Sequence, residues 1–234
     1  MSKTNAPVNP LQQPKRRISP GIIVVIVLVL ALAGGVGVQY WRGHSKVEVS
    51  SSGRPEPTVI TGPGTSGKGV TVGNTDAKVH IDIYLDFRCP HCAEFEESTG
   101  ATVDKLVQDG TAKLTYWPLA FVNPDASPRL ANAFAAAAAN GKALSYADEM
   151  YGDFSKSWTT DQLLDLGTQL GIGDATFQQA VRGNTYGGWL DSVSKAADDR
   201  GVTGTPTVYV NDKQLDSNQL TADGLQKAVD AIAS

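Results

Sequence analysis

Residues 79–92 decide the fold, and they read Val79-His80-Ile81-Asp82-Ile83-Tyr84-Leu85-Asp86-Phe87-Arg88-Cys89-Pro90-His91-Cys92. Up to Phe87, apolar residues alternate with more polar ones, a period of two that predicts a β-strand with one buried face. Proline is favoured at the first position inside a helix, so Pro90 predicts that a helix begins directly after Cys89. The stretch therefore predicts a strand that delivers Cys89 to the N-terminus of a helix.

This position predicts an unusually acidic thiol at Cys89. The unpaired backbone N–H groups and the dipole of a helix N-terminus stabilise a thiolate. An imidazolium at His91 would stabilise it further. Because a thiolate is the reactive form of cysteine, Cys89 is the candidate nucleophile, with Pro90 and His91 as the residues that tune it and Cys92 as its partner.

Cys89 and Cys92 are also the only cysteines of the chain, which bears on the nature of the pair. A structural zinc site needs about four ligands at matching spacing. The remaining candidates, His44, His80 and His91, form no such pattern. A zinc site and an inert structural disulfide stay as alternatives. The favoured interpretation is a redox-active dithiol that needs neither a metal nor a cofactor besides the Cys89–Cys92 disulfide.

The N-terminal region predicts a membrane segment. Residues 1–20 hold four basic residues and no acid, and residues 21–38 carry no charge, with Tyr40 and Trp41 just beyond them. Such a length and an interfacial aromatic pair are typical of a transmembrane helix, here placed at residues 21–41. The positive flank predicts a cytoplasmic tail, so everything after residue 42 is expected on the outer side of the cell membrane.

A second interpretation of the same segment remains open. Ala31-Leu32-Ala33, followed by two glycines, resembles the small-residue cleavage site of a signal peptide. The segment could then be removed instead of retained as an anchor. Both interpretations predict that the rest of the chain is exported.

Beyond the segment, composition predicts a flexible linker over 42–69 and one compact domain over 70–234. The linker is rich in Ser, Gly, Pro and Thr. Without the four basic residues of the tail, the rest of the chain has 16 basic and 24 acidic residues, a net charge of −8. Phosphate binding needs a basic face, so nucleic acid is not an expected partner.

Inside the domain the patterns predict strands and helices in the order of an α/β fold. After the leading strands and the helix that begins at Cys89 comes a strand over 113–119. Helical patterns then dominate about 125–200, including a capping sequence at Thr159 that predicts a helix start. Two short strands around Asn211-Asp212 predict a hairpin, and an amphipathic helix ends the domain.

Gly204-Thr205-Pro206-Thr207 is the second landmark, because it places a proline at the very start of a strand. Together with Cys89-Pro90-His91-Cys92, it makes the chain resemble the DsbA family of thiol-disulfide oxidoreductases over residues 70–234. The resemblance implies a thioredoxin-like fold with a central mixed sheet and an inserted helical domain. It also implies that the Thr205–Pro206 bond is cis and faces the cysteines, and that Thr205 offers its backbone to a substrate peptide. Cys89 would be the exposed nucleophile and Cys92 its shielded partner.

One position departs from the thioredoxin pattern. Many relatives carry a buried acid six residues before the first cysteine, where this chain has Ile83. Asp82 and Asp86 lie nearby and are candidates for a proton-handling role. Asp86 could equally stabilise the turn that leads to Cys89.

The expected function is a membrane-anchored, extracytoplasmic oxidase that introduces disulfides into reduced exported proteins. The resemblance implies a membrane quinone-linked thiol oxidase as the partner that reoxidises Cys89 and Cys92. Two other functions stay open: a thiol reductase or disulfide isomerase on the same fold, and a non-catalytic binding module tethered to the membrane.

Overall fold

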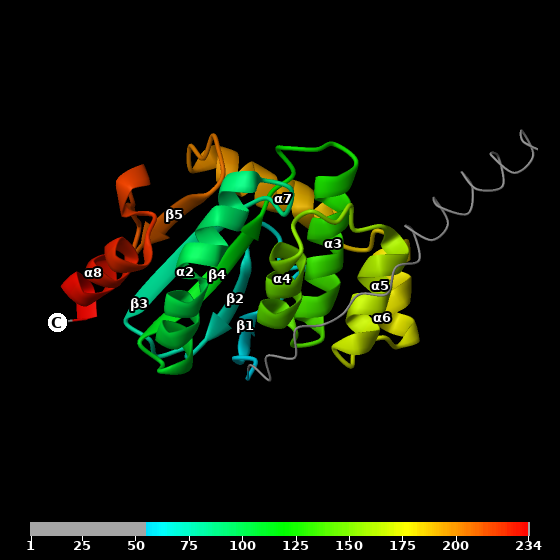
Figure 1. Ribbon diagram of the computed structural model, residues 1–234, viewed down its shortest axis with the longest axis horizontal. Helices are drawn as coiled ribbons and strands as arrows, with labels where there is room; N and C mark the ends of the chain where they lie inside the picture. The colour runs from blue at the N-terminus through cyan, green and yellow to red at the C-terminus, as the bar shows by residue number, and fades with distance from the viewer. Residues whose placement is uncertain (1–54, 234) are drawn as a thin grey trace, which may run out of the picture. The chain divides into compact units, whose positions relative to one another are not determined.

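The computed structural model describes residues 55–233 and shows a mixed six-stranded sheet flanked by helices (Figure 1). The strand order is β1-β2-β4-β3-β5-β6, in which β3 and β4 are parallel and all other neighbours are antiparallel. The strands are β1 (Val59–Thr61), β2 (Val70–Gly73), β3 (Val79–Leu85), β4 (Ala112–Pro118), β5 (Thr207–Val210) and β6 (Lys213–Gln214).

The central strand β3 forms where apolar residues alternate with more polar ones, as the sequence predicts. Val79, Ile81, Ile83 and Leu85 are at most 2 % exposed, so one face of the strand lies wholly in the core. β3 pairs with β4 in parallel from Val79 opposite Ala112 onward. Both strands therefore end at the same edge of the sheet, where the loops that follow them meet.

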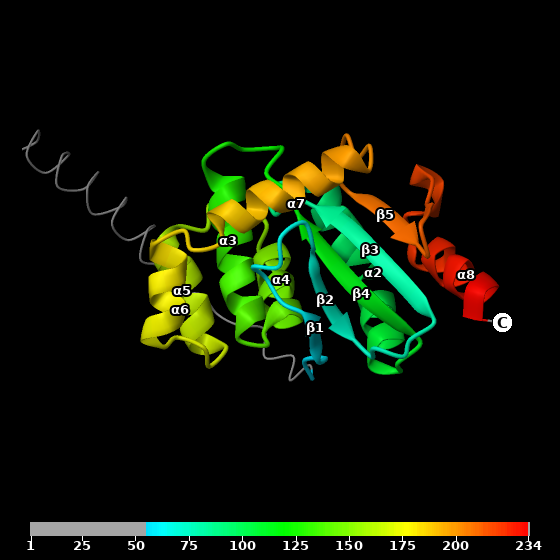
Figure 2. The same cartoon turned by 180° about the vertical axis from the view of Figure 1, so that it is seen from behind.

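Helices cover both faces of the sheet. α2 (Pro90–Gln108) and α8 (Ala222–Ala233) lie on one face, in front of the sheet in Figure 1, and α7 (Gly187–Asp199) crosses the opposite face (Figure 2). A short 3₁₀ helix, η1 (Ser217–Gln219), precedes α8. The two-layered cover explains why the middle strands are buried on both sides.

Five helices stand between β4 and β5, in the part of the chain where an inserted helical domain is expected. They are α3 (Ala126–Ala139), α4 (Ala143–Gly152), α5 (Thr160–Gln169), α6 (Ala175–Arg182) and α7. The predicted capping box is present, since Thr159 accepts from the Gln162 backbone N–H and Gln162 accepts from that of Thr159. The alanine-rich α3 is buried over most of its length, which allows neighbouring helices to pack closely against it.

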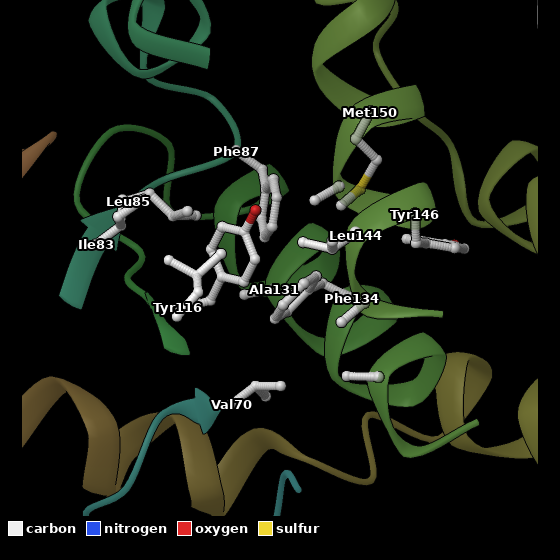
Figure 3. Packing of buried hydrophobic residues seen from close by; sticks show 14 of the residues in the cluster. Val70, Ile83, Leu85, Phe87, Tyr116, Ala131, Phe134, Leu144, Tyr146 and Met150 are labelled. Atoms are coloured by element: carbon white, nitrogen blue, oxygen red, sulfur yellow. The ribbon is translucent and has the colours of Figure 1, made fainter. Parts of the chain in front are cut away.

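The core is continuous between the sheet and this helical region (Figure 3). The ring of Phe87 lies 5.2 Å from that of Phe134 on α3 and 5.2 Å from that of Tyr151 on α4, and Tyr116 of β4 contacts Phe134 from the sheet side. Aromatic pairs at such distances add to the free energy of burial. The chain just before Cys89 is therefore fixed to the helical region.

The expectation of a flexible linker over 42–69 is wrong for its described part. Val59–Thr61 forms strand β1, which pairs with β2, and Glu56 accepts hydrogen bonds from the backbone N–H groups of Leu144 (3.1 Å) and Ser145 (2.9 Å). Glu56 thus binds the free N–H groups at the start of α4. These contacts attach residues 56–61 to the domain.

The predicted hairpin is present. Asn211 and Asp212 have φ values of 44° and 66° between β5 and β6, and positive φ at both central residues gives a tight turn that matches the twist of the strands. No helix within residues 55–233 is both long and apolar enough to cross a membrane. The expected basic tail and membrane segment fall outside the described residues.

Candidate active site

Cys89 lies at the N-terminal end of α2, as the sequence predicts. Its backbone is extended (φ −83°, ψ 119°), Pro90 is the first helical residue, and the N–H groups of Cys92 and Ala93 donate to the Cys89 carbonyl. The Cys89 N–H donates to the Asp86 carbonyl at 2.9 Å. These bonds form a tight turn between β3 and α2 that presents the Cys89 side chain beside the free N–H groups of the helix.

The loop 201–206 faces Cys89 from across the site. The Thr205–Pro206 bond is cis, as the resemblance implies. The Cys89 sulfur lies 3.3 Å from the Thr205 carbonyl oxygen, to which Cys89 donates when its thiol is protonated. Cys89 is 5 % exposed and Cys92 is 2 % exposed, and both thiols are free. Cys89 is therefore less open than the expectation of an exposed nucleophile, because the loop covers it.

The two thiols differ sharply in acidity. The pKa of Cys89 is lowered to about 5, chiefly by a hydrogen bond from Cys92, and also by the Thr205 side chain and by the backbone N–H groups of Cys92 and His91, which outweigh the effect of burial. The hydrogen bond to Cys89 and burial raise the pKa of Cys92. At neutral pH the reduced site thus holds a thiolate at Cys89 and a protonated thiol at Cys92.

The imidazole of His91 points to solvent and not to Cys89. Its side chain is 77 % exposed and its Nδ1 lies 3.0 Å from Glu94. Glu94, and to a smaller extent the Cys89 thiolate, raise the pKa of His91. Among the largest contributions to the Cys89 pKa, His91 acts through its backbone N–H. The Cys92 thiol and the backbone N–H groups at the helix N-terminus, more than the imidazolium expected from the sequence, therefore stabilise the thiolate.

Asp86 is a structural acid of the active-site turn. Its side chain is fully buried and accepts four hydrogen bonds, which come from Arg88 N (2.7 Å), Ser127 Oγ (2.8 Å), Phe121 N (2.8 Å) and Val122 N (2.9 Å). With all its acceptor sites in use, the carboxylate joins the turn before Cys89 to the loop after β4. This arrangement supports the turn-stabilising alternative for Asp86.

The other candidate acid, Asp82, lies on the opposite face of the sheet from Ile83, because successive side chains of a strand alternate. Ile83 belongs to the apolar core. Asp82 is bound by Trp117 Nε1 at 2.7 Å and by Arg200 Nη1 at 3.1 Å. One of these partners thus lies on the neighbouring strand β4 and the other at the end of α7.

Arg88 is a part of the site that sequence reasoning missed. Its guanidinium donates to the carbonyls of Phe154 (3.2 Å) and Lys156 (2.9 Å) and lies 5.1 Å from the centre of the Phe154 ring. These contacts attach the residue before Cys89 to the loop after α4. The only signal in the sequence was a basic residue inside an otherwise apolar and acidic turn.

A thioredoxin family model matches residues 65–231. The chain belongs to the thioredoxin family. The thiol:disulfide interchange protein DsbA of Yersinia pestis is 28 % identical over 140 residues, which are 58 % of this chain and 67 % of that protein.

Two solved structures share the fold. MdbA, a thiol-disulfide oxidoreductase from Corynebacterium diphtheriae, is 23 % identical with a TM-score of 0.60, covering 80 % of this chain and 98 % of that one. BdbD from Bacillus subtilis in its oxidised form is 20 % identical with a TM-score of 0.63, covering 76 % and 99 %. The paired thiols and the similarity to DsbA identify this member of the thioredoxin family as a DsbA-like thiol-disulfide oxidoreductase.

DsbA-like enzymes work through a redox-active cysteine pair. In residues 55–233, no group of three or more His, Cys, Asp or Glu side chains is placed to hold a metal ion.

The acidity of Cys89 predicts a pH dependence for the reduced DsbA-like enzyme. A pKa lowered from 9.0 to about 5 contributes stability that is fully present above the unfolded value and is lost as the pH falls through about 5. The free energy of unfolding of the reduced enzyme should therefore fall between pH 7 and pH 4, relative to the oxidised enzyme, which has no thiolate. Urea unfolding of both forms at several pH values measures this difference.

The rate of Cys89 alkylation by iodoacetamide should follow the same titration, with a midpoint near pH 5. His91→Ala serves as the comparison. Because the exposed imidazole acts weakly on Cys89, we expect this variant to move the midpoint by less than about one pH unit. A midpoint near pH 8 to 9 in the unmodified enzyme, about the ordinary thiol range, would contradict the assignment of a stabilised thiolate.

Proposed function

We propose that this enzyme is an extracytoplasmic dithiol oxidase that introduces disulfides into exported proteins through Cys89 and Cys92. The observation that carries the proposal is the placement of Cys89 at the N-terminal end of α2, with Cys92 buried in the same helix. This placement goes with a pKa lowered to about 5 at Cys89 and raised at Cys92. A site that stabilises the Cys89 thiolate stabilises the reduced enzyme. Its disulfide is accordingly a stronger oxidant.

The reaction begins with the Cys89–Cys92 disulfide. A substrate thiolate attacks the Cys89 sulfur, a substrate–Cys89 disulfide forms, and the Cys89–Cys92 bond breaks. Cys92 leaves with the electron pair and takes up a proton, because its pKa is raised. A protonated Cys92 attacks the mixed disulfide slowly, which disfavours the reverse step.

A second substrate thiolate then attacks the substrate sulfur of the mixed disulfide. The substrate disulfide forms and Cys89 leaves as a thiolate. A leaving thiol of low pKa departs faster, so the lowered pKa of Cys89 accelerates release of the oxidised substrate. The two electrons of the substrate remain on the enzyme as a thiolate and a thiol.

Thr205 is the proposed docking point for the substrate backbone. Its carbonyl faces the Cys89 sulfur at 3.3 Å and precedes β5. An extended peptide that pairs with the backbone there would bring its own cysteine to Cys89. Pro206 occupies the next position, where no N–H competes for the peptide.

We also propose that the domain is exported and that its cysteine pair is reoxidised at the membrane. The uncharged residues 21–38 and the basic residues before them support an outward-facing domain, tethered to the membrane or released after cleavage. Disulfides persist in that compartment. A membrane quinone-linked thiol oxidase is the proposed acceptor of the two electrons.

The reduction potential of the cysteine pair tests the direction of electron flow. Equilibration of the enzyme with defined glutathione buffers should give a value more positive than about −200 mV. In parallel, the oxidised enzyme should form disulfides in a reduced, unfolded protein, and a Cys89→Ser, Cys92→Ser double variant should not. A potential near the thioredoxin value of about −270 mV would instead indicate a reductase.

A further inference from the structure

Arg200 lies at the start of the loop that carries Thr205 and reaches across the face of the sheet that α7 covers. It is the C-terminal cap of α7, and its N–H donates to the carbonyls of the last helical turn. Its guanidinium lies 3.9 Å from the centre of the Tyr209 ring on β5 and 5.8 Å from that of Tyr84 on β3. One side chain thus contacts aromatic rings on two neighbouring strands.

The guanidinium is held mainly by a buried acid of β3. Arg200 Nη1 lies 3.1 Å from Asp82 Oδ2 and 3.2 Å from the Tyr84 hydroxyl, and Nη2 lies 2.8 Å from Asp212. The Asp82 side chain is 4 % exposed, the Arg200 side chain 25 % and the Asp212 side chain 92 %. Screening is weakest in the buried pair, so Asp82 is the dominant partner of Arg200.

The other oxygen of Asp82 is occupied as well. It accepts from Trp117 Nε1 at 2.7 Å, and the Trp117 ring stacks on that of Tyr84 with 5.1 Å between centroids. Asp82 is therefore fixed in place on β3 before Arg200 reaches it. A rigid acceptor of this kind defines where the guanidinium, and the chain that carries it, must lie.

The same strand determines the position of Cys89. β3 ends at Leu85 and the turn to Cys89 follows at once. At its far end the loop 201–206 enters β5, where Thr207 pairs with Tyr84. Both ends of the loop are consequently attached to one short piece of β3, at Asp82 through Arg200 and at Tyr84 through the sheet.

We propose that Arg200 is a positioning residue, which with Asp82 holds the loop 201–206 against β3 so that Thr205 faces Cys89 and an incoming substrate peptide. Arg200 acts through Thr205 and touches neither the sulfur atoms nor the substrate. The proposal deepens the proposed function, because it assigns residues to peptide docking at Thr205. Neither the Cys89-Pro90-His91-Cys92 motif nor the proline turn contains the pair.

The test compares Arg200→Ala, Arg200→Lys and Asp82→Asn with the unmodified enzyme. The control is Arg182→Ala, which removes an arginine from an ion pair with Asp161 in which both side chains are more than half exposed. Oxidation of a reduced model peptide gives KM and kcat, alkylation of the reduced enzyme gives the Cys89 titration, and urea unfolding gives the folded fraction.

We expect Arg200→Ala and Asp82→Asn each to raise KM by about five- to tenfold, while kcat changes less. Both variants should also move the alkylation midpoint upward, because Thr205 no longer stays against Cys89. Arg200→Lys keeps the charge but loses the planar fork and should fall in between. Combining Arg200→Ala with Asp82→Asn should add little to either change. The control should match the unmodified enzyme in all three readouts.

A purely structural role would look different. If Asp82→Asn, which keeps the shape of the side chain and leaves Arg200 over Tyr209, lowers stability but leaves KM and the alkylation midpoint unchanged, the proposal is wrong. The alkylation readout requires no peptide. An enzyme that fails to oxidise any peptide would therefore refute the proposed function, while the alkylation midpoints of the variants would still decide the role of Arg200.

Discussion

Cys89→Ser should reduce thiol–disulfide exchange by on the order of a thousandfold or more, down to the uncatalysed rate. The reason is that both steps of the reaction use the same sulfur, first as the atom attacked and then as the leaving group. Oxidation of a reduced substrate protein by the variant, compared with the unmodified enzyme at equal concentration, measures the loss. The fold should survive, because serine is close to cysteine in volume.

Cys92→Ala supplies the complementary result. It leaves the acidic Cys89 in place, so the Cys89 thiolate can attack a disulfide of an exported protein and release one substrate thiolate, while no second enzyme sulfur remains to resolve the mixed disulfide that forms. We expect covalent adducts with exported proteins to accumulate through Cys89, visible on non-reducing gels and absent from the Cys89→Ser, Cys92→Ala double variant. Adducts in a similar amount in Cys89→Ser, whose one remaining thiol is Cys92, would contradict the assignment of Cys89 as the nucleophile.

The elements that could be predicted from the sequence are those with a clear local pattern of residues. β3 and the start of α2 follow from local patterns, since a buried strand shows a period of two and proline marks the first turn of a helix. The hairpin at Asn211-Asp212 follows from turn chemistry of the same local kind. The cis bond before Pro206 came from the family resemblance, because a single X–Pro pair does not reveal its isomer.

What the sequence did not reveal depends on contacts between distant residues. β1 has only three residues, too few for a periodic pattern, and it is fixed by β2 and by Glu56 at the start of α4. Glu56 is 88 residues away from Leu144 in the chain. Nothing near it in the sequence marks it as a capping residue, and the surrounding Gly, Ser and Pro predict a linker.

The roles of the acids near Cys89 also depend on contacts with residues that are distant in the sequence. The sequence placed Asp82 and Asp86 within a few residues of Ile83, and alternation along a strand separates Asp82 from Ile83. It could not show that Asp86 is occupied by donors from the loop after β4 and from α3. The direction of the His91 ring was also open, because a residue in the first turn of a helix can point to solvent or across the helix end.

Asp86→Ala should be the most destabilising single substitution in the active-site turn, with a loss of about 3 to 5 kcal/mol in the free energy of unfolding. The buried carboxylate accepts from the backbone N–H groups of Phe121, Val122 and Arg88 and from the hydroxyl of Ser127. Its removal leaves these donors without an acceptor, and each unsatisfied buried group costs about 1 to 3 kcal/mol. Urea unfolding of the oxidised enzyme gives the loss without the contribution of the Cys89 thiolate.

Matched variants separate the role of Asp86 from a general sensitivity of the region. Ser127→Ala removes one of the four donors and should cost only about 1 kcal/mol. Asp125→Ala removes a nearby exposed acid whose side chain makes no capping bond to α3, and should change stability by less than about 0.5 kcal/mol. Asp86→Asn is decisive, because the amide keeps the shape but presents N–H donors where two donors already point. If Asn at this position were as stable as Asp, acceptance of hydrogen bonds would not be what holds the turn, and Cys89 would owe its position to Phe87 and Arg88 instead.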